Sequence, residues 1–387
     1  MAYTHDELDF LFAHPEALQL AAKLPLNRKS LLSDQTTLRK QFGEHTRAIV
    51  ELATARRRIQ AKLGDGQWFA DTDCAQQATP AVVSEFRALT LQECGATSVA
   101  DVTCSVGTEM LHGQNWASGS DIDLVRLRMA QHNLREAGRD LPLACADALT
   151  PVWNADAIVA DPARRDSSGR VARLEDMMPP VADLAMRYDR LAVKCAPGLK
   201  VGDVHDWAGQ VDFVSVNGDM KEACVYSRGL VGGTRGVRAV VLGERTEVWT
   251  QDMPDDCEVG DVGRFIIDPD AAVIRAGLVR HYGHAHGLWQ LDEHLAYLTG
   301  DSVPSGMRGF EVLEAIPLRQ ARAALKARKV GATEILVRGV DVDPDDLRKK
   351  WKLKGPERVS VIIARIDRAD TRMAFVCRPV IGPVTGS

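Results

Sequence analysis

Four aspartates near the ends of predicted strands are the side chains of this chain best placed to recognise a ligand. They are Asp101, Asp121, Asp147 and Asp161. The strands that carry or precede them are expected at 99–102, 119–122, 143–144 and 157–160. In a parallel sheet the carboxyl ends of the strands share one edge, and ligands bind at that edge. We therefore expect the four carboxylates to surround one ligand.

The turn after the first of these aspartates narrows the choice of ligand. Small residues fill this turn, namely Thr103, Cys104, Ser105 and Gly107. It contains neither Gly-Lys-Ser/Thr nor Gly-x-Gly-x-x-Gly, so it does not predict a site for a pyrophosphate. Asp121 lies twenty positions after Asp101, where a carboxylate can accept hydrogen bonds from ribose hydroxyls. S-adenosylmethionine, which has a ribose and an amino-acid tail but no pyrophosphate, fits this pattern.

Each part of that ligand has an expected partner. Asp101 is expected near the ammonium group, the backbone of 104–107 near the body of the ligand, and Asp121 on the ribose hydroxyls. Asp147 is expected to accept a hydrogen bond from the adenine amino group. The complete predicted cofactor site consists of Asp101, Thr103, Cys104, Ser105, Gly107, Asp121, Ile122, Asp147 and Ala148.

The Asp-Pro-Ala-Arg-Arg segment at 161–165 is placed to hold a methyl acceptor. Methyl transfer from a sulfonium requires that a nucleophilic acceptor atom be held in line with the methyl group. Asp161 can take a proton or a hydrogen bond from an attacking amino group, and the backbone after Pro162 can orient that group. Arg164 and Arg165 can hold an anionic substrate or stack on a base, with ion pairing to neighbouring acids as the alternative. We assign the catalytic role to Asp161, Pro162 and Arg164.

These residues need an α/β domain to position them, and 387 residues are enough for several domains. We expect a helical N-terminal domain at 1–66, a Rossmann-like α/β domain at 67–243, a connecting, ferredoxin-like segment at 244–312 and a small α+β module at 313–387. The span 31–63 is expected to be helical, and a further helix is expected to begin at Pro80 with Thr79 as its N-cap. The last module is expected to contain a three-stranded sheet.

Charge is distributed unevenly along the chain. The segment 317–378 carries a net charge of +8, whereas the rest of the chain carries −13. A basic module attached to an acidic body fits an RNA-binding surface, and the solvated surface of a small domain is the alternative. The triplet Arg56-Arg57-Arg58 is most simply a solvated face, with an RNA surface as its alternative.

Composition argues against several other classes of protein. Eight scattered cysteines without a Cys-x-x-Cys pair do not predict a zinc site or a disulfide framework. The four histidines between 281 and 294 lack a familiar ligand spacing, so no metal is expected. No run of 18 apolar residues predicts a membrane span, and the N-terminus lacks a signal pattern. We therefore expect a cytoplasmic protein that does not enter a membrane.

Motifs along nearly the whole chain resemble class I S-adenosylmethionine-dependent methyltransferases. They lie at 77–80, 101–109, 121–123, 146–148, 161–165, 215–222 and 338–344. The resemblance is strongest to the bacterial group with a THUMP-like C-terminal domain, related to trimethylguanosine synthase-like and RNA guanine methyltransferases. It implies S-adenosylmethionine as the cofactor and RNA as the substrate, methylated at a base amino group or ring nitrogen. It also implies that the substrate contacts Gln77, Thr79, Arg164, Arg165, Asn217 and Lys221.

Two departures from the family pattern leave other functions open. Thr103 and Ser105 replace two glycines of the family's cofactor turn, and a Cβ restricts positive φ and close approach to a ligand. In addition, amino-directed enzymes of this kind often carry an aromatic residue at this point to stack on the base, and no aromatic residue follows Asp161-Pro-Ala here. The alternatives are a small-molecule methyltransferase and a non-catalytic RNA-binding protein with a degenerate cofactor turn.

Overall fold

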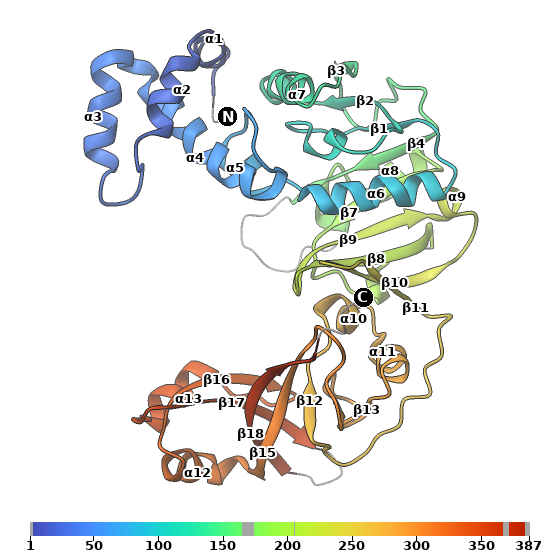
Figure 1. Cartoon of the computed structure of the whole chain (residues 1–387). Coiled ribbons are helices and arrows are strands. Elements are labelled where there is room, and N and C mark those ends of the chain that lie inside the picture. Colours follow the sequence, from blue (N-terminus) through green and yellow to red (C-terminus); the bar gives the residue numbers. More distant parts are fainter. Residues whose placement is uncertain (1–2, 165–173, 205, 367–370, 384–387) are drawn as a thin grey trace. The chain divides into compact units, whose positions relative to one another are not determined.

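A computed structural model describes residues 3–164, 174–204, 206–366 and 371–383, and the chain divides into two compact units (Figure 1). The first unit comprises Met1–Val216 and Lys221–Gly236, and the second comprises Asn217–Met220 and Val237–Ser387. The predicted ligand-binding sheet lies in the first unit, and the basic C-terminal module lies in the second.

Helices open the first unit, with α1 at His5–Ala13, α2 at Pro15–Ala22, α3 at Leu31–Phe42 and α4 at Thr46–Leu63. The span 31–63 is helical as expected, and Gly43, with a φ of +54°, separates α3 from α4 within it. Apolar residues at helical spacing on α4, among them Ile49, Leu52 and Ile59, are fully buried. This is the pattern of an amphipathic helix that packs on a core.

The arginine triplet on α4 is exposed at Arg57 and Arg58, as expected of a solvated face, whereas Arg56 is half-buried. The Nε of Arg56 donates to the carbonyl of Trp68 at 3.0 Å. Arg57 donates through Nη1 to the carbonyl of Pro25 at 2.7 Å. Both guanidinium groups therefore bind backbone carbonyls of neighbouring segments.

The large sheet positions the predicted site. In the first unit its strands follow the order β8-β9-β7-β4-β1-β2-β3. The bounds are β1 Val99–Asp101, β2 Trp116–Asp121, β3 Leu143–Cys145, β4 Ala157–Ala160, β7 Leu191–Cys195, β8 Ala208–Val216 and β9 Asp219–Ser227. The five neighbouring strands β3, β2, β1, β4 and β7 pair in parallel, and β9 is antiparallel to β7. Strands β4 and β7 are buried throughout, as in the centre of a parallel sheet.

Helices accompany this sheet along the chain. They are α5 Thr72–Gln77, α6 Ala81–Glu93, α7 Leu124–Glu136, α8 Val181–Arg187 and α9 Arg228–Val231. A single turn of 3-10 helix, η2 (Thr108–Leu111), follows the cofactor turn between β1 and β2. The alternation of parallel strands and helices confirms the expected Rossmann-like α/β class.

The second unit contains another sheet, with the strand order β13-β14-β12-β15-β18-β17-β16. Its strands are β12 Phe265–Ile267, β13 Trp289–Gln290, β14 Leu298–Gly300, β15 Arg308–Pro317, β16 Val330–Arg338, β17 Glu357–Ile366 and β18 Thr371–Ile381. A hairpin of β10 (Gly236–Leu242) and β11 (Glu247–Thr250) precedes them. The expected three-stranded sheet is therefore wrong, because β15 pairs with β18 along its length and joins the other strands to it.

Side chains alternate between two cores across this second sheet. Val361 and Ile363 of β17 pack in a core with Leu325 of α12 (Ala321–Ala327) and Trp351 of α13 (Pro344–Trp351). Ile362, between them in sequence, packs on the opposite face. The short helices α10 (Ala271–Arg275) and α11 (Val279–Ala285) lie earlier in this unit. Within the described ranges, no helix is long and apolar enough to cross a membrane.

Candidate active site

The sheet brings the four predicted aspartates to one edge. Asp101 and Asp121 are the last residues of the adjacent parallel strands β1 and β2. Asp161 directly follows β4, and Asp147 lies two residues beyond β3. Because β3, β2, β1 and β4 are parallel neighbours, all four residues lie at their carboxyl ends. The placement predicted from the sequence is confirmed.

The cofactor turn binds the carboxylate of Asp121 through its backbone. The N–H of Ser105 donates to Oδ2 of Asp121 at 2.9 Å, and the N–H of Asp123 donates to Oδ1 at 2.9 Å. Ser105 adopts a φ of +48°, so it keeps the left-handed conformation that glycine favours, at a cost of about 1–2 kcal/mol. Asp123 in turn caps α7 by accepting from the N–H of Val125 at 2.8 Å. The turn therefore has a defined shape without glycine at position 105.

Helix α7 holds the same turn from behind. The amide of Asn133, which is fully buried, donates to the carbonyls of Val106 and Phe69, both at 2.8 Å. Its oxygen accepts from the N–H of Phe69 at 2.7 Å. Gly107 has a φ of +80°, and a Cβ there would lie 3.2 Å from the Cβ of Ala130 on α7. The sequence reading missed Asn133, because a lone asparagine on a predicted helix gives no local signal.

Asp101 is a buried acid with a perturbed pKa. Only 3% of its surface is exposed, and its Oδ1 accepts from the N–H of Thr103 at 2.9 Å. Burial, with smaller contributions from Glu109 and Asp161, raises the pKa of Asp101 to about 7. Such a carboxyl ionises readily when a cationic ligand arrives.

The segment after β3 offers an exposed acid and a fixed backbone. The Oδ1 of Asp147 accepts from the N–H of Leu149 at 2.8 Å, while the residue as a whole is exposed. The hydroxyl of Tyr188 donates to the carbonyl of buried Ala148 at 2.7 Å. Ile122, directly after Asp121, is 75% exposed and presents an apolar side chain next to that edge.

Asp161 is held by contacts on two sides. Its backbone N–H donates to the hydroxyl oxygen of Thr103 at 2.6 Å, which ties the acceptor segment to the cofactor turn. Its Oδ2 accepts from the Nζ of Lys194, on β7, at 2.5 Å. Asp161 nevertheless remains 46% exposed, whereas Lys194 is buried. Lys194 was not predicted, because it is a single charge inside an apolar strand.

Lys194 belongs to a buried chain of alternating charges. Its Nζ lies 3.5 Å from Glu109, whose Oε1 accepts from the Nε of Arg87 at 2.6 Å. The Nη2 of Arg87 donates to Glu222 at 2.5 Å. Burial opposes the ionisation of Glu109, but Arg87 and then Lys194 outweigh it and lower the pKa of Glu109 to about 2. Asp161 is thus the exposed end of an otherwise buried network.

The predicted substrate residues of the first unit lie in different settings. Gln77 ends α5 and is exposed, and Lys221 on β9 is exposed. Thr79 is buried, and its side chain helps to lower the pKa of Glu109. Its expected role as the N-cap of α6 is wrong, because Pro80 occupies that position and makes no side-chain cap.

The remaining predicted substrate residues are described only in part. Arg164 is placed as the end of the short strand β5 (Ala163–Arg164), which pairs with β6 (Met177–Met178), and buried Pro162 precedes it. Arg165 lies outside the described residues. Asn217, in the second unit, has a φ of +51° and with Gly218 forms the turn between β8 and β9.

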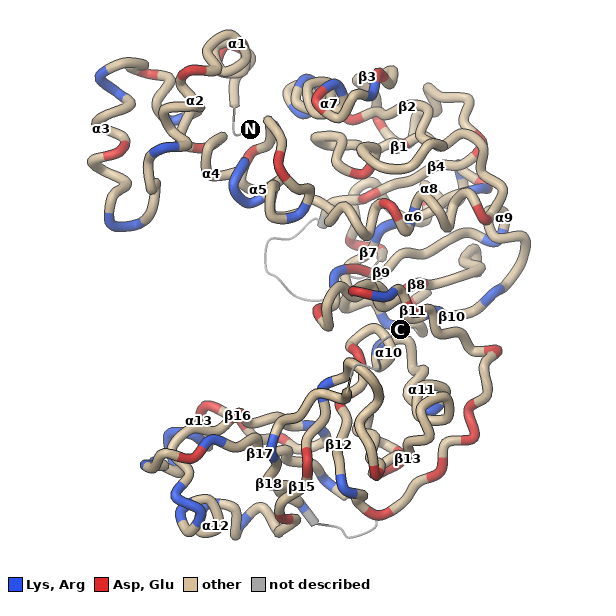
Figure 2. The backbone as a smooth tube through the Cα atoms, in the orientation of Figure 1, with Lys and Arg blue, Asp and Glu red and all other residues tan. Residues whose placement is uncertain are grey.

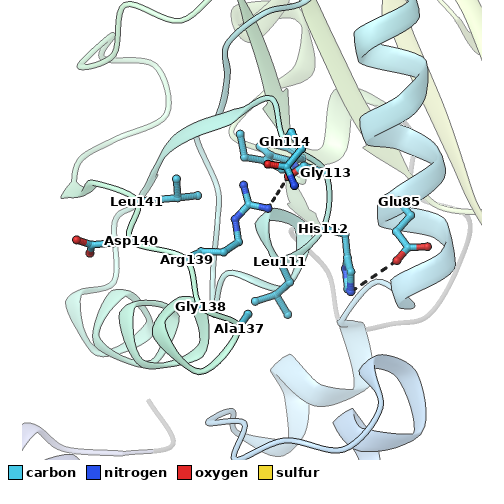
Figure 3. A pocket seen from close by; sticks show the side chains of 11 residues that line it. Glu85, Leu111, His112, Gly113, Gln114, Ala137, Gly138, Arg139, Asp140 and Leu141 are labelled. Carbon is cyan, nitrogen blue, oxygen red and sulfur yellow. Dashed lines mark hydrogen bonds and ion pairs between the residues drawn. The ribbon is translucent and has the colours of Figure 1, made fainter.

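A cavity of about 610 Å³ lies at the other edge of the sheet. It is lined by residues that precede β2 and β3, including His112 and Arg139, and by Glu85 of α6 (Figure 3). Arg139 donates to the carbonyl of Gly113, and the Nε2 of His112 lies 4.0 Å from the Oε1 of Glu85. Because this cavity faces the amino ends of the strands, it is separate from the four aspartates.

Comparison with known proteins gives the class of this chain. Residues 307–379 match a family model described as THUMP domain-like. Proteins from two Mycobacterium tuberculosis strains, CDC 1551 and H37Rv, are each 43% identical over 360 residues, covering 88% of this chain and 99% of theirs. Both are described as uncharacterized S-adenosylmethionine-dependent methyltransferases. A crystal structure of a Porphyromonas gingivalis W83 protein assigned to the methyltransferases shares the fold, with a TM-score of 0.70, 18% identity and coverage of 98% and 99%.

The chain is therefore an enzyme and belongs to the S-adenosylmethionine-dependent methyltransferases, with a THUMP-like C-terminal domain. Its cofactor is S-adenosylmethionine, which supplies a methyl group on a sulfonium when it is bound. The residues at the sheet edge fit that cofactor by their chemistry. They combine a buried carboxyl at Asp101, a second carboxyl at Asp121 and the exposed apolar side chain of Ile122.

Proposed function

We propose that this enzyme methylates RNA in the cytoplasm, at a base amino group or ring nitrogen. The observation that carries the proposal is the basic C-terminal module, whose residues 307–379 match the THUMP domain-like family. A net charge of +8 over 317–378 favours the phosphate backbone of a nucleic acid, whereas the rest of the chain is acidic. In this proposal the RNA is methylated at the site in the first unit and is bound through its phosphates by the basic surface of the C-terminal module.

In this proposal the carboxylates hold the cofactor. Asp101 pairs with its ammonium group, and Asp121, fixed by the N–H of Ser105, accepts from the ribose hydroxyls. Asp147 accepts from the adenine amino group, and the exposed side chain of Ile122 covers an adenine face. The backbone from Thr103 to Gly107, including Cys104, lies along the body of the cofactor.

The acceptor lies at Asp161, and positive charge gathers near it. Burial, then Lys194 and Lys221, lower the pKa of Lys62, so the amino groups of Lys194 and Lys221 each lie within electrostatic reach of Lys62. Lys62 also donates to the carbonyl of Ala78 at 2.8 Å. We propose that Lys221 and the arginines of the acceptor segment contact phosphates next to the target nucleotide, with Gln77 beside them.

The RNA-binding surface is proposed to follow α12 and α13 of the second unit. Figure 2 shows Lys and Arg gathered along these two helices. The basic residues of α12, of α13 and of the segments that follow them are Arg322, Lys326, Arg328, Lys329, Arg348, Lys349, Lys350, Lys352 and Lys354. Some of them pair with acids, as Arg328 does with Glu314 at 3.0 Å. The basic side chains of this surface that do not pair with an acid are proposed to contact phosphates.

The test measures transfer of a labelled methyl group from S-adenosylmethionine to total bacterial RNA. A variant with Lys350, Lys352 and Lys354 changed to Glu is expected to lose most transfer and RNA binding while keeping cofactor affinity. The matched control changes three exposed lysines of the N-terminal helical region, Lys23, Lys29 and Lys40, to Glu. Wild-type binding is expected to weaken steeply with salt, and the slope is expected to be smaller in the first variant only. Transfer to a small molecule with no salt-dependent RNA binding would refute the proposal.

A further inference from the structure

Lys194 reaches Asp161 from inside the protein, and methyl transfer itself does not require a lysine at this place. Lys194 is buried on β7, and its Nζ lies 2.5 Å from Oδ2 of Asp161. The same Nζ lies 3.5 Å from Oε2 of Glu109, an oxygen that is buried without a hydrogen bond among the described residues. Lys194 therefore directs its hydrogen bond to Asp161 rather than to its other acidic neighbour.

The rest of the network keeps Lys194 in place. Glu109 is bound by Arg87, and Arg87 is bound by Glu222, so the two cations alternate with three carboxylates. Burial would lower the pKa of Lys194, but Asp161, Glu109 and Glu222 outweigh it and raise that pKa. Lys194 thus remains an ammonium group and cannot act as a base. A cation that is held in this way can orient a carboxylate through a charge-assisted hydrogen bond.

We propose that Lys194 is a positioning residue that presents Asp161 to the methyl acceptor as a hydrogen-bond acceptor, so that the acceptor must be a group that carries a hydrogen. This inference rests on the proposed function, and it removes from the acceptors named there the ring nitrogens that carry no hydrogen. With Oδ2 bound to Lys194, the accessible part of the carboxylate has only lone pairs to offer. An exocyclic amino group donates to it, whereas a ring nitrogen without hydrogen brings its own lone pair and is repelled.

The transfer step balances for such an acceptor. The nitrogen lone pair forms the new bond to the methyl carbon while the carbon–sulfur bond breaks and leaves its electron pair on sulfur. The nitrogen then carries a positive charge and releases one of its protons, through Asp161, to solvent. Asp161 orients the lone pair before transfer and stabilises the positive charge that develops.

A double-mutant cycle tests the positioning role. Asp161→Ala is expected to lower kcat at least 100-fold, and Lys194→Met at least tenfold, with KM for RNA and cofactor affinity changed by less than threefold. If Lys194 acts through Asp161, the double variant is no slower than Asp161→Ala. Lys194→Arg is expected to recover most of the rate. Multiplication of the two effects in the double variant would overturn the proposal, and Lys194→Gln replaces Lys194→Met if the latter does not fold.

Product analysis tests the acceptor class. Nucleosides from RNA methylated in vitro are expected to carry the methyl group on a nitrogen that bore a hydrogen, either an exocyclic amino group or a ring N–H, and a methylated ring nitrogen that had no hydrogen would overturn the inference. Failure of the proposed function looks different, because wild-type enzyme that binds cofactor then labels no RNA. In that case the same cycle is measured on the free energy of unfolding without substrate. Absence of coupling between Lys194 and Asp161 there would overturn their pairing independently.

Discussion

Replacing Asp101 with asparagine should stabilise the protein at alkaline pH and remove its ability to bind cofactor. The pKa of this carboxyl is about 7 in the folded chain, against an ordinary value of 3.8. An acid whose pKa is raised on folding stabilises the folded state most below the unfolded value, and this contribution is lost as the pH rises through the folded pKa. Above pH 7 the folded protein therefore holds a buried charge at a cost of about 4 kcal/mol.

Asparagine removes that charge and keeps an oxygen that can accept from the N–H of Thr103. We expect Asp101→Asn to raise the free energy of unfolding by up to about 4 kcal/mol at pH 8, but by less than about 2 kcal/mol at pH 5. Urea unfolding without cofactor, followed by circular dichroism at both pH values, measures the difference. The exposed Asp65 provides the control, since Asp65→Asn removes the same charge and should change stability by less than about 0.5 kcal/mol.

Two outcomes would refute this reasoning. One is an Asp101→Asn protein that is less stable than wild type at pH 8, and the other is an equal gain at both pH values. Calorimetry on the same variant should show loss of S-adenosylmethionine binding, because the neutral amide cannot pair with the ammonium group. Stability gained together with binding lost would identify Asp101 as an acid kept in the protein for its function.

Three further predictions concern the cofactor turn. Affinity for S-adenosylmethionine should be about tenfold weaker at pH 6 than at pH 8, because below its pKa Asp101 must release a proton to pair with the ammonium group; a constant affinity by calorimetry would contradict this. Asn133→Ala should lower the free energy of unfolding by about 3–5 kcal/mol and weaken cofactor binding, since it leaves buried backbone groups unpaired. An unchanged urea midpoint would show that the hydrogen bonds of Asn133 do not hold the turn in place. Gly107→Ala should cost about 1–3 kcal/mol, and more than Gly138→Ala, because both have positive φ but only the first meets Ala130; equal thermal shifts would contradict the packing argument.

The strand-end aspartates could be predicted from the sequence because both parts of the signal are local. An apolar run followed by an acid marks the strand ends at Asp101 and Asp161, Asp121 is marked by its spacing from Asp101, and parallel pairing then brings the four acids together. Lys194 and Arg87 gave no such signal, because each is a single charge among apolar neighbours and acquires its meaning only from partners far along the chain. Arg87 and Glu222, for example, are 135 positions apart. Strand β15 was missed for a related reason, since it is defined by its pairing with β18, more than fifty residues later.

The cofactor turn explains how a methyltransferase site can persist without two of its family's glycines. A glycine at position 105 would allow positive φ, but Ser105 already adopts it, and its N–H bond to Asp121 offsets part of the cost. At position 103 the side chain has a use, because the hydroxyl of Thr103 accepts from the N–H of Asp161 and joins the cofactor turn to the acceptor segment. Only Gly107 lacks a substitute, since a Cβ there meets α7. The glycine that remains is the one whose replacement the packing cannot accommodate, and the threonine at position 103 makes a side-chain contact that glycine cannot make.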